Sequence, residues 1–318
     1  MHSNMFIFFW LFTIIFQNIY LLLFHNNINS IKGGVNKAVI KYVLKDDDNA
    51  FEHSINVYKM GSATSKNVIV FISGGFRVAF DTYLQKIVSD LLAVDHMRNN
   101  YQLIVLEKLD KQTFISIQDF TTTVLTLHDQ IKFEDLTIFG FSTGGIIASH
   151  VMASLGALKC KKKIITYDTP YQVIENVMSF ENYTFYRPDF YFYHLIYKTY
   201  LDHYNYAEIK SHVKHDKWTN GSADFLKMML AVHNISYEDF YKLSEFNLNQ
   251  EKGTKLIQIY CECDPIVDRK ICDDFINKHI DKFNDLNMVN DKKPWIGHCS
   301  DVWSPYFDIE CVINHITR

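Results

Sequence analysis

The sequence has no long run of basic residues, and its formal net charge is −4 at pH 7. Proteins that bind nucleic acid usually carry a positive surface, so we do not expect nucleic acid to be the main partner. The six cysteines also include no pair in the CxxC spacing. Structural zinc sites commonly use such pairs, so neither a metal site nor another cofactor is predicted.

Glycine and proline are scarce, with 12 and 5 residues among 318, while Asn, Ile, Lys, Phe and Tyr are abundant. This bias indicates an AT-rich genome, so short motifs are expected to arise by chance. Hydrophobic residues make up 48% of the chain and charged residues 21%, which is ordinary for a globular protein with a substantial core. His212, His215 and Asp216 lie close in sequence, but no further ligand stands at an informative spacing, so we do not interpret them as a metal site.

The N-terminal segment stands apart because residues 5–24 contain no charged side chain. This length is about what a helix needs to span a bilayer. Three interpretations stand, in this order: a signal anchor in the membrane, a cleaved signal peptide of a secreted or lumenal protein, and a buried helix. No small-x-small cleavage site follows, which favours the anchor. Residues 1–30 are therefore treated as separate from the folded domain.

Strand-like apolar runs alternate with helical patterns along most of the remaining chain. Strands are predicted at 38–44, 53–60, 67–75, 101–107, 136–142, 162–168, 254–264 and 286–290. Helices are predicted at 82–97, 115–131, 143–159 and 307–316. Continuously apolar strands are typical of a parallel sheet covered on both faces. We therefore predict a doubly wound, mostly parallel α/β fold.

The strand–helix alternation stops between residues 171 and 252, where aromatic residues crowd together. We interpret this range as a helical, aromatic-rich cap inserted after the sixth strand. The core domain then comprises residues 31–170 and 253–318. Such an insertion can pack on the core and also act as a lid that lines an apolar pocket.

The segment Gly140-Phe141-Ser142-Thr143-Gly144 matches the pattern G-x-S-x-G and stands between a predicted strand and a predicted helix. In this setting the serine sits on a tight, strained turn that exposes its hydroxyl, and the glycines avoid collisions with the neighbouring backbone. The following helix directs its positive end toward the serine. A helix cap is the alternative role for such a serine, but the context favours a nucleophile.

Four short segments resemble the α/β-hydrolase superfamily in their order and strand positions. They are FISGG at 71–75, GFSTGG at 140–145, CDPIVD at 263–268 and GHCSD at 297–301. The resemblance covers roughly residues 38–170 and 253–316, whereas the middle insertion matches no single member. It implies a serine esterase or lipase-like enzyme, without a subfamily.

The resemblance implies a catalytic triad in the order nucleophile, acid, histidine. Ser142 would be the nucleophile and His298, which follows a glycine near the C-terminus, the base. Asp264 at the end of a strand would be the acid that orients the histidine. Asp168 at the end of the preceding strand is the alternative acid, because some lipases of this fold carry the acid there.

The resemblance also implies an oxyanion hole made of two backbone N–H groups. One would belong to Thr143, directly after the nucleophile, and the other to Gly75 in the loop after the strand 67–72. The family often has His-Gly in this loop, whereas Ser73 stands in place of the histidine here. The backbone donor does not depend on that side chain.

Together these features predict a serine hydrolase that cleaves carboxylic esters through an acyl-enzyme. The aromatic insertion favours an apolar acyl group in a small-molecule or lipid ester, and the N-terminal segment would hold the enzyme at a membrane. Thioesterase, peptidase and acyltransferase activities use the same triad and stay open. A non-catalytic binding protein with the hydrolase fold is the alternative of another class.

Overall fold

The computed structural model describes residues 35–46, 49–74, 82–108, 117–179, 241, 243–261, 264, 267–293 and 309–318. Within these residues, eight strands form one sheet in the order β1-β2-β4-β3-β5-β6-β7-β8. The strands are β1 (Asn36–Asp46), β2 (Asn49–Gly61), β3 (Asn67–Ile72), β4 (Gln102–Lys108), β5 (Asp135–Phe141), β6 (Lys161–Tyr167), β7 (Lys255–Cys261) and β8 (Val289–Lys293). The β1–β2 and β2–β4 pairs are antiparallel, and the other neighbours are parallel.

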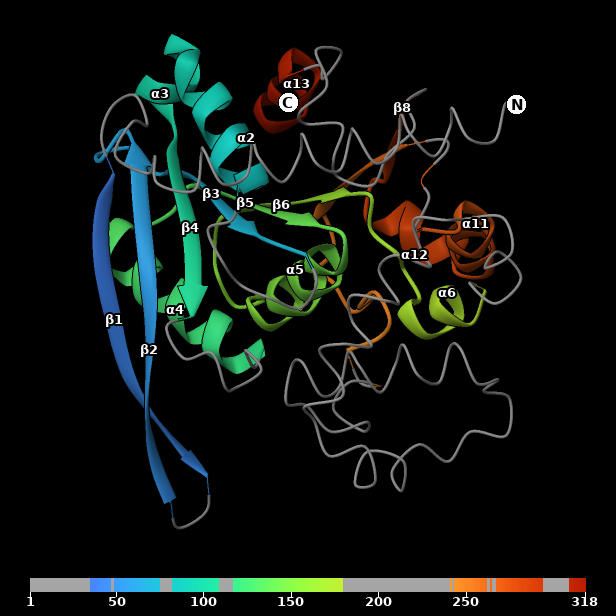
Figure 1. The fold of residues 1–318 in the computed structure, drawn as a ribbon, viewed down its shortest axis with the longest axis horizontal. Helices are drawn as coiled ribbons and strands as arrows, with labels where there is room; N and C mark the ends of the chain where they lie inside the picture. Colours follow the sequence, from blue (N-terminus) through green and yellow to red (C-terminus); the bar gives the residue numbers. More distant parts are fainter. Residues whose placement is uncertain are drawn as a thin grey trace, which may run out of the picture.

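Helices cover both faces of this sheet (Figure 1). One face carries α4 (Ile117–Ile131) and α5 (Thr143–Ser154). The opposite face carries α2 (Thr82–Ala93), α3 (Asp95–Asn100) and α13 (Ile309–Thr317). The chain therefore winds to both sides of a central sheet.

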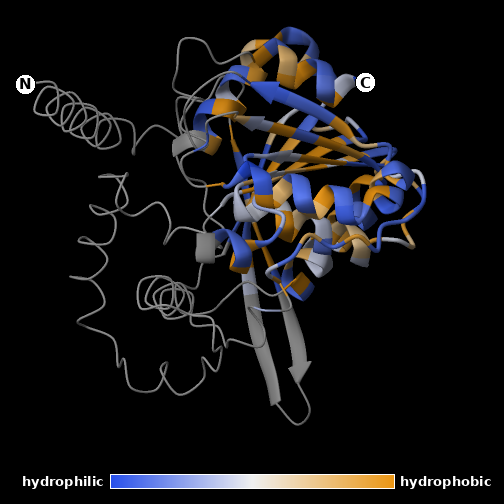
Figure 2. Ribbon diagram, turned by 90° about the vertical axis from the view of Figure 1, so that its right-hand side faces the viewer, coloured by the Kyte–Doolittle hydropathy of each residue, from blue (hydrophilic) through white to orange (hydrophobic). Residues whose placement is uncertain are grey.

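The central strands are apolar on both faces, which explains the two helical layers. In β3, Val68, Val70 and Ile72 belong to the core shared with α4 and α5. The alternate residues Ile69 and Phe71 belong to the core shared with α2 and α13. The central strands of the sheet are largely hydrophobic, while the helices mix hydrophobic and hydrophilic residues (Figure 2). The predicted doubly wound, mostly parallel fold is confirmed.

The last strand lies at Val289–Lys293 rather than at the predicted 286–290. The apolar pattern was misleading because Leu286 is buried directly after α12 (Ile280–Asp285) and not in a strand. Asn287 then adopts a positive φ of 47°, which separates the helix from β8. As the edge strand, β8 has mostly polar and exposed residues, so apolar periodicity does not reveal it.

The helix α11 (Arg269–Lys278) was not predicted either, although its start has a recognisable signal. The Asp268 carboxylate accepts a hydrogen bond of 2.9 Å from the Lys270 N–H and so caps the helix. Cys272 and Phe275 are buried on one side of α11. The acidic and basic residues around them conceal this short apolar stripe in the sequence.

Most of the predicted cap, residues 180–240, lies outside the described residues. The described residues at both ends of the predicted range pack on the core. The Tyr171 ring, just before α6 (Val173–Ser179), lies 4.7 Å from the Phe246 ring and stacks on Phe283 at 5.8 Å. All three side chains are buried. The chain therefore leaves and re-enters the core at one aromatic cluster.

The predicted membrane segment, residues 5–24, also lies outside the described residues. In the part of the chain that the structure describes, no helix combines the length and the apolar character needed to cross a bilayer. Membrane anchoring stays a prediction from the sequence.

Candidate active site

The predicted site residues follow strands that end at the same edge of the sheet. The strand register aligns Ile72 with Gly140, and Phe141 with Tyr167. In β7, Ile259 is aligned with Tyr167. The segments after β3, β5, β6 and β7 therefore emerge together, as parallel strands require. Ser142, Thr143, Asp168 and Asp264 all lie in these segments.

Ser142 has an unusual backbone conformation between β5 and α5. Its φ is 49° and its ψ is −128°, a combination that costs a non-glycine residue about 1–3 kcal/mol. The Ser142 N–H donates a hydrogen bond of 2.8 Å to the Tyr167 carbonyl, and its own carbonyl accepts from the Gly145 N–H at 3.0 Å. In α5, which the structure describes in full, the Ser142 side chain makes no capping hydrogen bond. The strained turn therefore does not serve to cap the helix.

The glycines around Ser142 allow backbone segments to approach one another closely. A Cβ on Gly144 would lie 2.4 Å from the Ser73 carbonyl oxygen and 2.5 Å from that of Ile72. A Cβ on Gly140 would lie 2.4 Å from the Gly144 oxygen. These separations are far below a van der Waals contact, so both positions require glycine. The first turn of α5 is thus pressed against the end of β3.

Gly74, the second residue after β3, lies directly beside Ser142. A Cβ on Gly74 would lie 2.7 Å from the Ser142 Cβ and 3.5 Å from its Oγ. The backbone around Gly74 is therefore near the hydroxyl, on the side from which an oxyanion donor is expected. Gly75, the predicted donor, lies outside the described residues. Thr143, the other predicted donor, is the first residue of α5 and is buried.

The Asp168 carboxylate joins the ends of β6 and β7. Its Oδ1 accepts from the Cys261 N–H at 2.7 Å, and its Oδ2 accepts from the Cys261 thiol at 3.3 Å. The Asp168 N–H donates to the Ile259 carbonyl at 3.0 Å. The residue is 1% exposed and has a positive φ of 47°. Sequence reasoning did not foresee that Cys261 would engage both oxygens of this carboxylate.

Asp264, the other candidate acid, stands on the turn after β7. Its Oδ1 accepts a hydrogen bond of 2.9 Å from the Val267 N–H, which fixes the carboxylate in the turn. Asp264 is half-buried. His298, the predicted base, lies outside the described residues and follows β8 by a few positions in the sequence.

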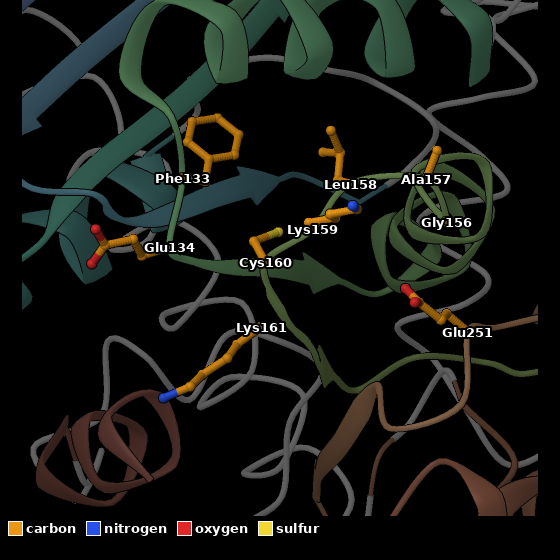
Figure 3. Close-up of a pocket in the computed structure, with 9 residues that line it drawn as sticks. All are labelled: Phe133, Glu134, Gly156, Ala157, Leu158, Lys159, Cys160, Lys161 and Glu251. Carbon is orange, nitrogen blue, oxygen red and sulfur yellow. The ribbon is translucent and has the colours of Figure 1, made fainter.

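A cavity of about 690 Å³ lies at the opposite edge of the sheet (Figure 3). Its lining includes Glu134 directly before β5, and Cys160 and Lys161 at the start of β6. These residues belong to the amino ends of the strands, whereas Ser142 follows a carboxyl end. The cavity is therefore separate from the candidate active site.

Three solved structures share this arrangement of the chain. Carboxyl esterase 2 from the fungus Tuber melanosporum is 12% identical, with a TM-score of 0.55, and the match covers 90% of this chain and 86% of that one. An esterase from Pyrococcus furiosus is 13% identical, with a TM-score of 0.53 and coverage of 91% and 92%. Homoserine O-acetyltransferase from Bacillus anthracis is 12% identical, with a TM-score of 0.51 and coverage of 89% and 98%.

These similarities define the fold of the chain and leave its activity open. No protein-family model matches the sequence, and no curated protein matches it either. The strand order, the helices on both faces and the similar structures together show that the chain has the α/β-hydrolase fold. Identities this low identify a shared fold, so the chemistry must be argued from the residues themselves.

We expect Gly144→Ala to destabilise the protein by about 1–3 kcal/mol and to abolish most of any esterase activity. The new methyl group would collide with the Ser73 and Ile72 carbonyls and push α5 away from β3. Urea unfolding measures the loss of stability, and an ester substrate measures the loss of activity.

Gly156→Ala is the matched control for this substitution. A Cβ there meets only the Ala153 carbonyl oxygen, at an ordinary 3.5 Å. This variant should keep both its stability and its activity. Equal effects from the two substitutions would show that the close approach of α5 to β3 is unimportant.

Proposed function

We propose that the chain is a serine hydrolase that cleaves carboxylic esters, with Ser142 as its nucleophile. The observation that carries the proposal is the strained Ser142 backbone, held by close glycine contacts at the start of α5 and not used to cap that helix. A strained conformation at the carboxyl edge of a parallel sheet is typical of functional residues. The α/β-hydrolase fold and the esterases that share it support the same conclusion.

In the proposed reaction, His298 removes the Ser142 hydroxyl proton as Oγ attacks the ester carbonyl. The carbonyl π electrons move to the oxygen, and the N–H groups of Thr143 and Gly75 stabilise the resulting oxyanion. Collapse of this intermediate breaks the C–O bond, and His298 gives its proton to the departing alcohol. Water, deprotonated by His298, then releases the acid and restores Ser142.

We assign the acid of the triad to Asp264 rather than Asp168. Asp168 is buried between two strand ends, and Cys261 donates to both of its oxygens. A carboxylate used in this way supports the sheet. Asp264 lies on a turn after the next strand and is half-buried, which suits a partner for a histidine that follows β8.

The acyl group and the final acceptor are the open parts of the proposal. The aromatic residues of 171–252 favour an apolar acyl group, and residues 5–24 would hold the enzyme at a membrane, or direct its secretion if they are cleaved. A second candidate function is acyl transfer, because the acetyltransferase from Bacillus anthracis shares the fold with a TM-score of 0.51. Thioesterase and peptidase activities use the same groups.

Asp264→Asn should lower kcat by about 10³-fold or more, because the histidine loses the carboxylate that fixes its tautomer. Asp168→Asn should mainly reduce stability, by about 1–3 kcal/mol, since the amide cannot accept from Cys261 at both positions. Ester hydrolysis and urea unfolding, run on both variants, separate the two effects. A larger activity loss in Asp168→Asn at unchanged stability would reverse the assignment.

A fluorophosphonate probe should label the folded protein at Ser142. The Ser142→Ala variant should lose the label, because the probe reacts with an activated serine. Ser154→Ala removes an exposed hydroxyl at the other end of α5 and should label normally. If the folded wild-type protein resists the probe, the chain is a non-catalytic binding protein.

Hydrolysis of esters with rising acyl length should show kcat/KM increasing toward longer chains, since an apolar pocket adds about 0.8 kcal/mol for each buried methylene. A maximum at the shortest acyl chains would remove the apolar-acyl part of the proposal and leave the esterase part. The same assays with an added alcohol acceptor distinguish hydrolysis from transfer. Preferential appearance of a new ester over the free acid would favour the acyltransferase.

A further inference from the structure

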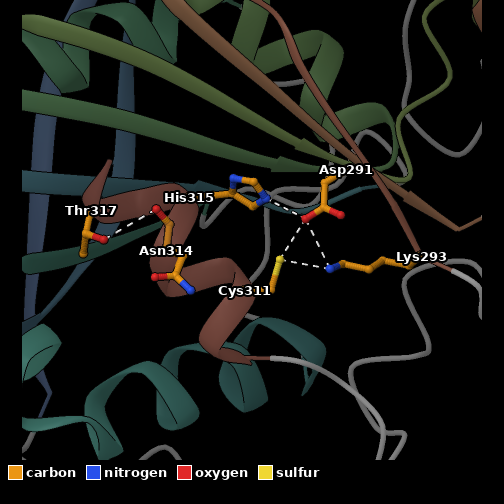
Figure 4. A network of polar contacts seen from close by, with 6 residues as sticks. All are labelled: Asp291, Lys293, Cys311, Asn314, His315 and Thr317. Carbon is orange, nitrogen blue, oxygen red and sulfur yellow. Dashed lines mark hydrogen bonds and ion pairs between the residues drawn. The ribbon is translucent and has the colours of Figure 1, made fainter.

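Four side chains meet between the edge strand β8 and the C-terminal helix α13 (Figure 4). The Asp291 Oδ2 accepts from His315 Nε2 at 2.6 Å and from the Cys311 thiol at 2.8 Å. The Lys293 ammonium lies 3.2 Å from the same oxygen and 2.9 Å from Cys311 Sγ. Asn314 and Thr317 of the same helix contact each other instead. The esterase mechanism uses none of these groups.

The local structure explains why these side chains converge. Cys311 and His315 are four residues apart in α13, so they lie on one face of the helix. Asp291 and Lys293 are two residues apart in β8, so they point to one face of the strand. Both faces are turned toward each other (Figure 4). The donor atoms are therefore positioned by regular backbone rather than by loops.

Asp291, Cys311 and His315 offer one oxygen, one sulfur and one nitrogen, all within 4.8 Å of one another. This mixture of donors suits zinc and related divalent metal ions. Ligand atoms around a tetrahedral zinc ion lie about 3.3–3.6 Å apart, given metal–ligand bonds of about 2.0–2.3 Å. The Asp291 oxygen now lies 2.6 Å from His315 Nε2 and 2.8 Å from Cys311 Sγ, so each of these two distances would need to increase by less than about 1 Å. We propose that Asp291, Cys311 and His315 bind a zinc-type divalent ion, with water as the fourth ligand.

Lys293 competes with the metal ion for the same ligands. Its ammonium group now supplies the positive charge that the Asp291 carboxylate needs, and the metal ion would replace it. The metal binds the thiolate, so its arrival releases the thiol proton to solvent. Coordination through His315 Nε2 requires the tautomer that carries its proton on Nδ1, so the proton that Nε2 now donates to Asp291 would move to the other ring nitrogen.

The metal ion has access to the site and a structural consequence there. The Asp291 and His315 side chains are 20% and 13% exposed, so an ion can reach them from solvent. Coordination would join β8 to α13, the two elements that flank residues 294–308 in the sequence. That segment contains His298. A metal ion bound there would therefore hold β8 and α13 together at the two ends of the segment that carries the proposed base.

The test uses the purified full chain in non-ionic detergent, titrated with Co²⁺ as a spectroscopic substitute for zinc. We expect a thiolate-to-cobalt charge-transfer band and intense visible bands typical of tetrahedral cobalt. Cys311→Ser should abolish the charge-transfer band, and Asp291→Asn should weaken binding by about 10-fold or more. Zn²⁺ should bleach the cobalt spectrum and raise the unfolding temperature.

Two further variants keep the test independent of folding defects. Cys160→Ser removes another half-buried free thiol and should leave the spectrum unchanged. Lys293→Met removes the competing ammonium and should tighten Co²⁺ binding by about 10-fold, a gain that misfolding cannot produce. The proposal fails if neither the wild-type protein nor Lys293→Met shows the charge-transfer band, or if the band survives in Cys311→Ser. In that case the four groups form a polar network and no metal site.

Discussion

The first turn of α5 lies so close to the end of β3 that only glycine fits between them. A Cβ on Gly144 would stand 2.4 Å from the Ser73 oxygen, and one on Gly140 would strike the same helical turn. This contact fixes the direction in which α5 leaves the sheet, and with it the strained backbone of Ser142. It also brings the loop after β3 beside the hydroxyl. In the proposed chemistry, the attack on the ester and the stabilisation of the oxyanion depend on this approach, because the nucleophile and the oxyanion donors come from the two segments that it joins.

The sequence was most informative where residues are buried on both sides. Strands such as β3 are apolar after their first residue, because each face meets a helical layer. The start of β3 was predicted correctly, whereas its end was predicted three residues too late. Prediction was weakest at the edge strand β8. This strand is polar and exposed, and the buried Leu286 before it imitates a strand. The cluster of Asp291, Cys311 and His315 was not predicted either. Asp291 lies 20 residues before Cys311, so the three residues form no recognisable spaced motif.

The two candidate acids, Asp168 and Asp264, show a second limit of prediction from the sequence. Asp168 directly follows β6, and Asp264 lies on the turn after β7 at the same end of the sheet, so position alone does not distinguish them. Their partners do. The thiol and the N–H of Cys261 both donate to the Asp168 carboxylate, which thereby connects β6 with β7. No local sequence pattern predicts this arrangement. Asp264 is set in a turn by the Val267 N–H. The proposed choice between them therefore rests on these hydrogen bonds, which depend on the folded structure and cannot be recognised in the sequence.

In the proposed mechanism, His298 acts on Ser142 and belongs to the sequence segment between β8 and α13. A longer segment has more accessible conformations. Fixing both of its ends removes part of this freedom in advance, so less entropy is lost when the base is placed for reaction. Asp291 on β8 already holds Cys311 and His315 on α13 through hydrogen bonds. A metal ion would replace these bonds with coordination that tolerates less movement. The edge strand, which contributes little to the core, would in that way contribute to catalysis by limiting the freedom of the segment that follows it.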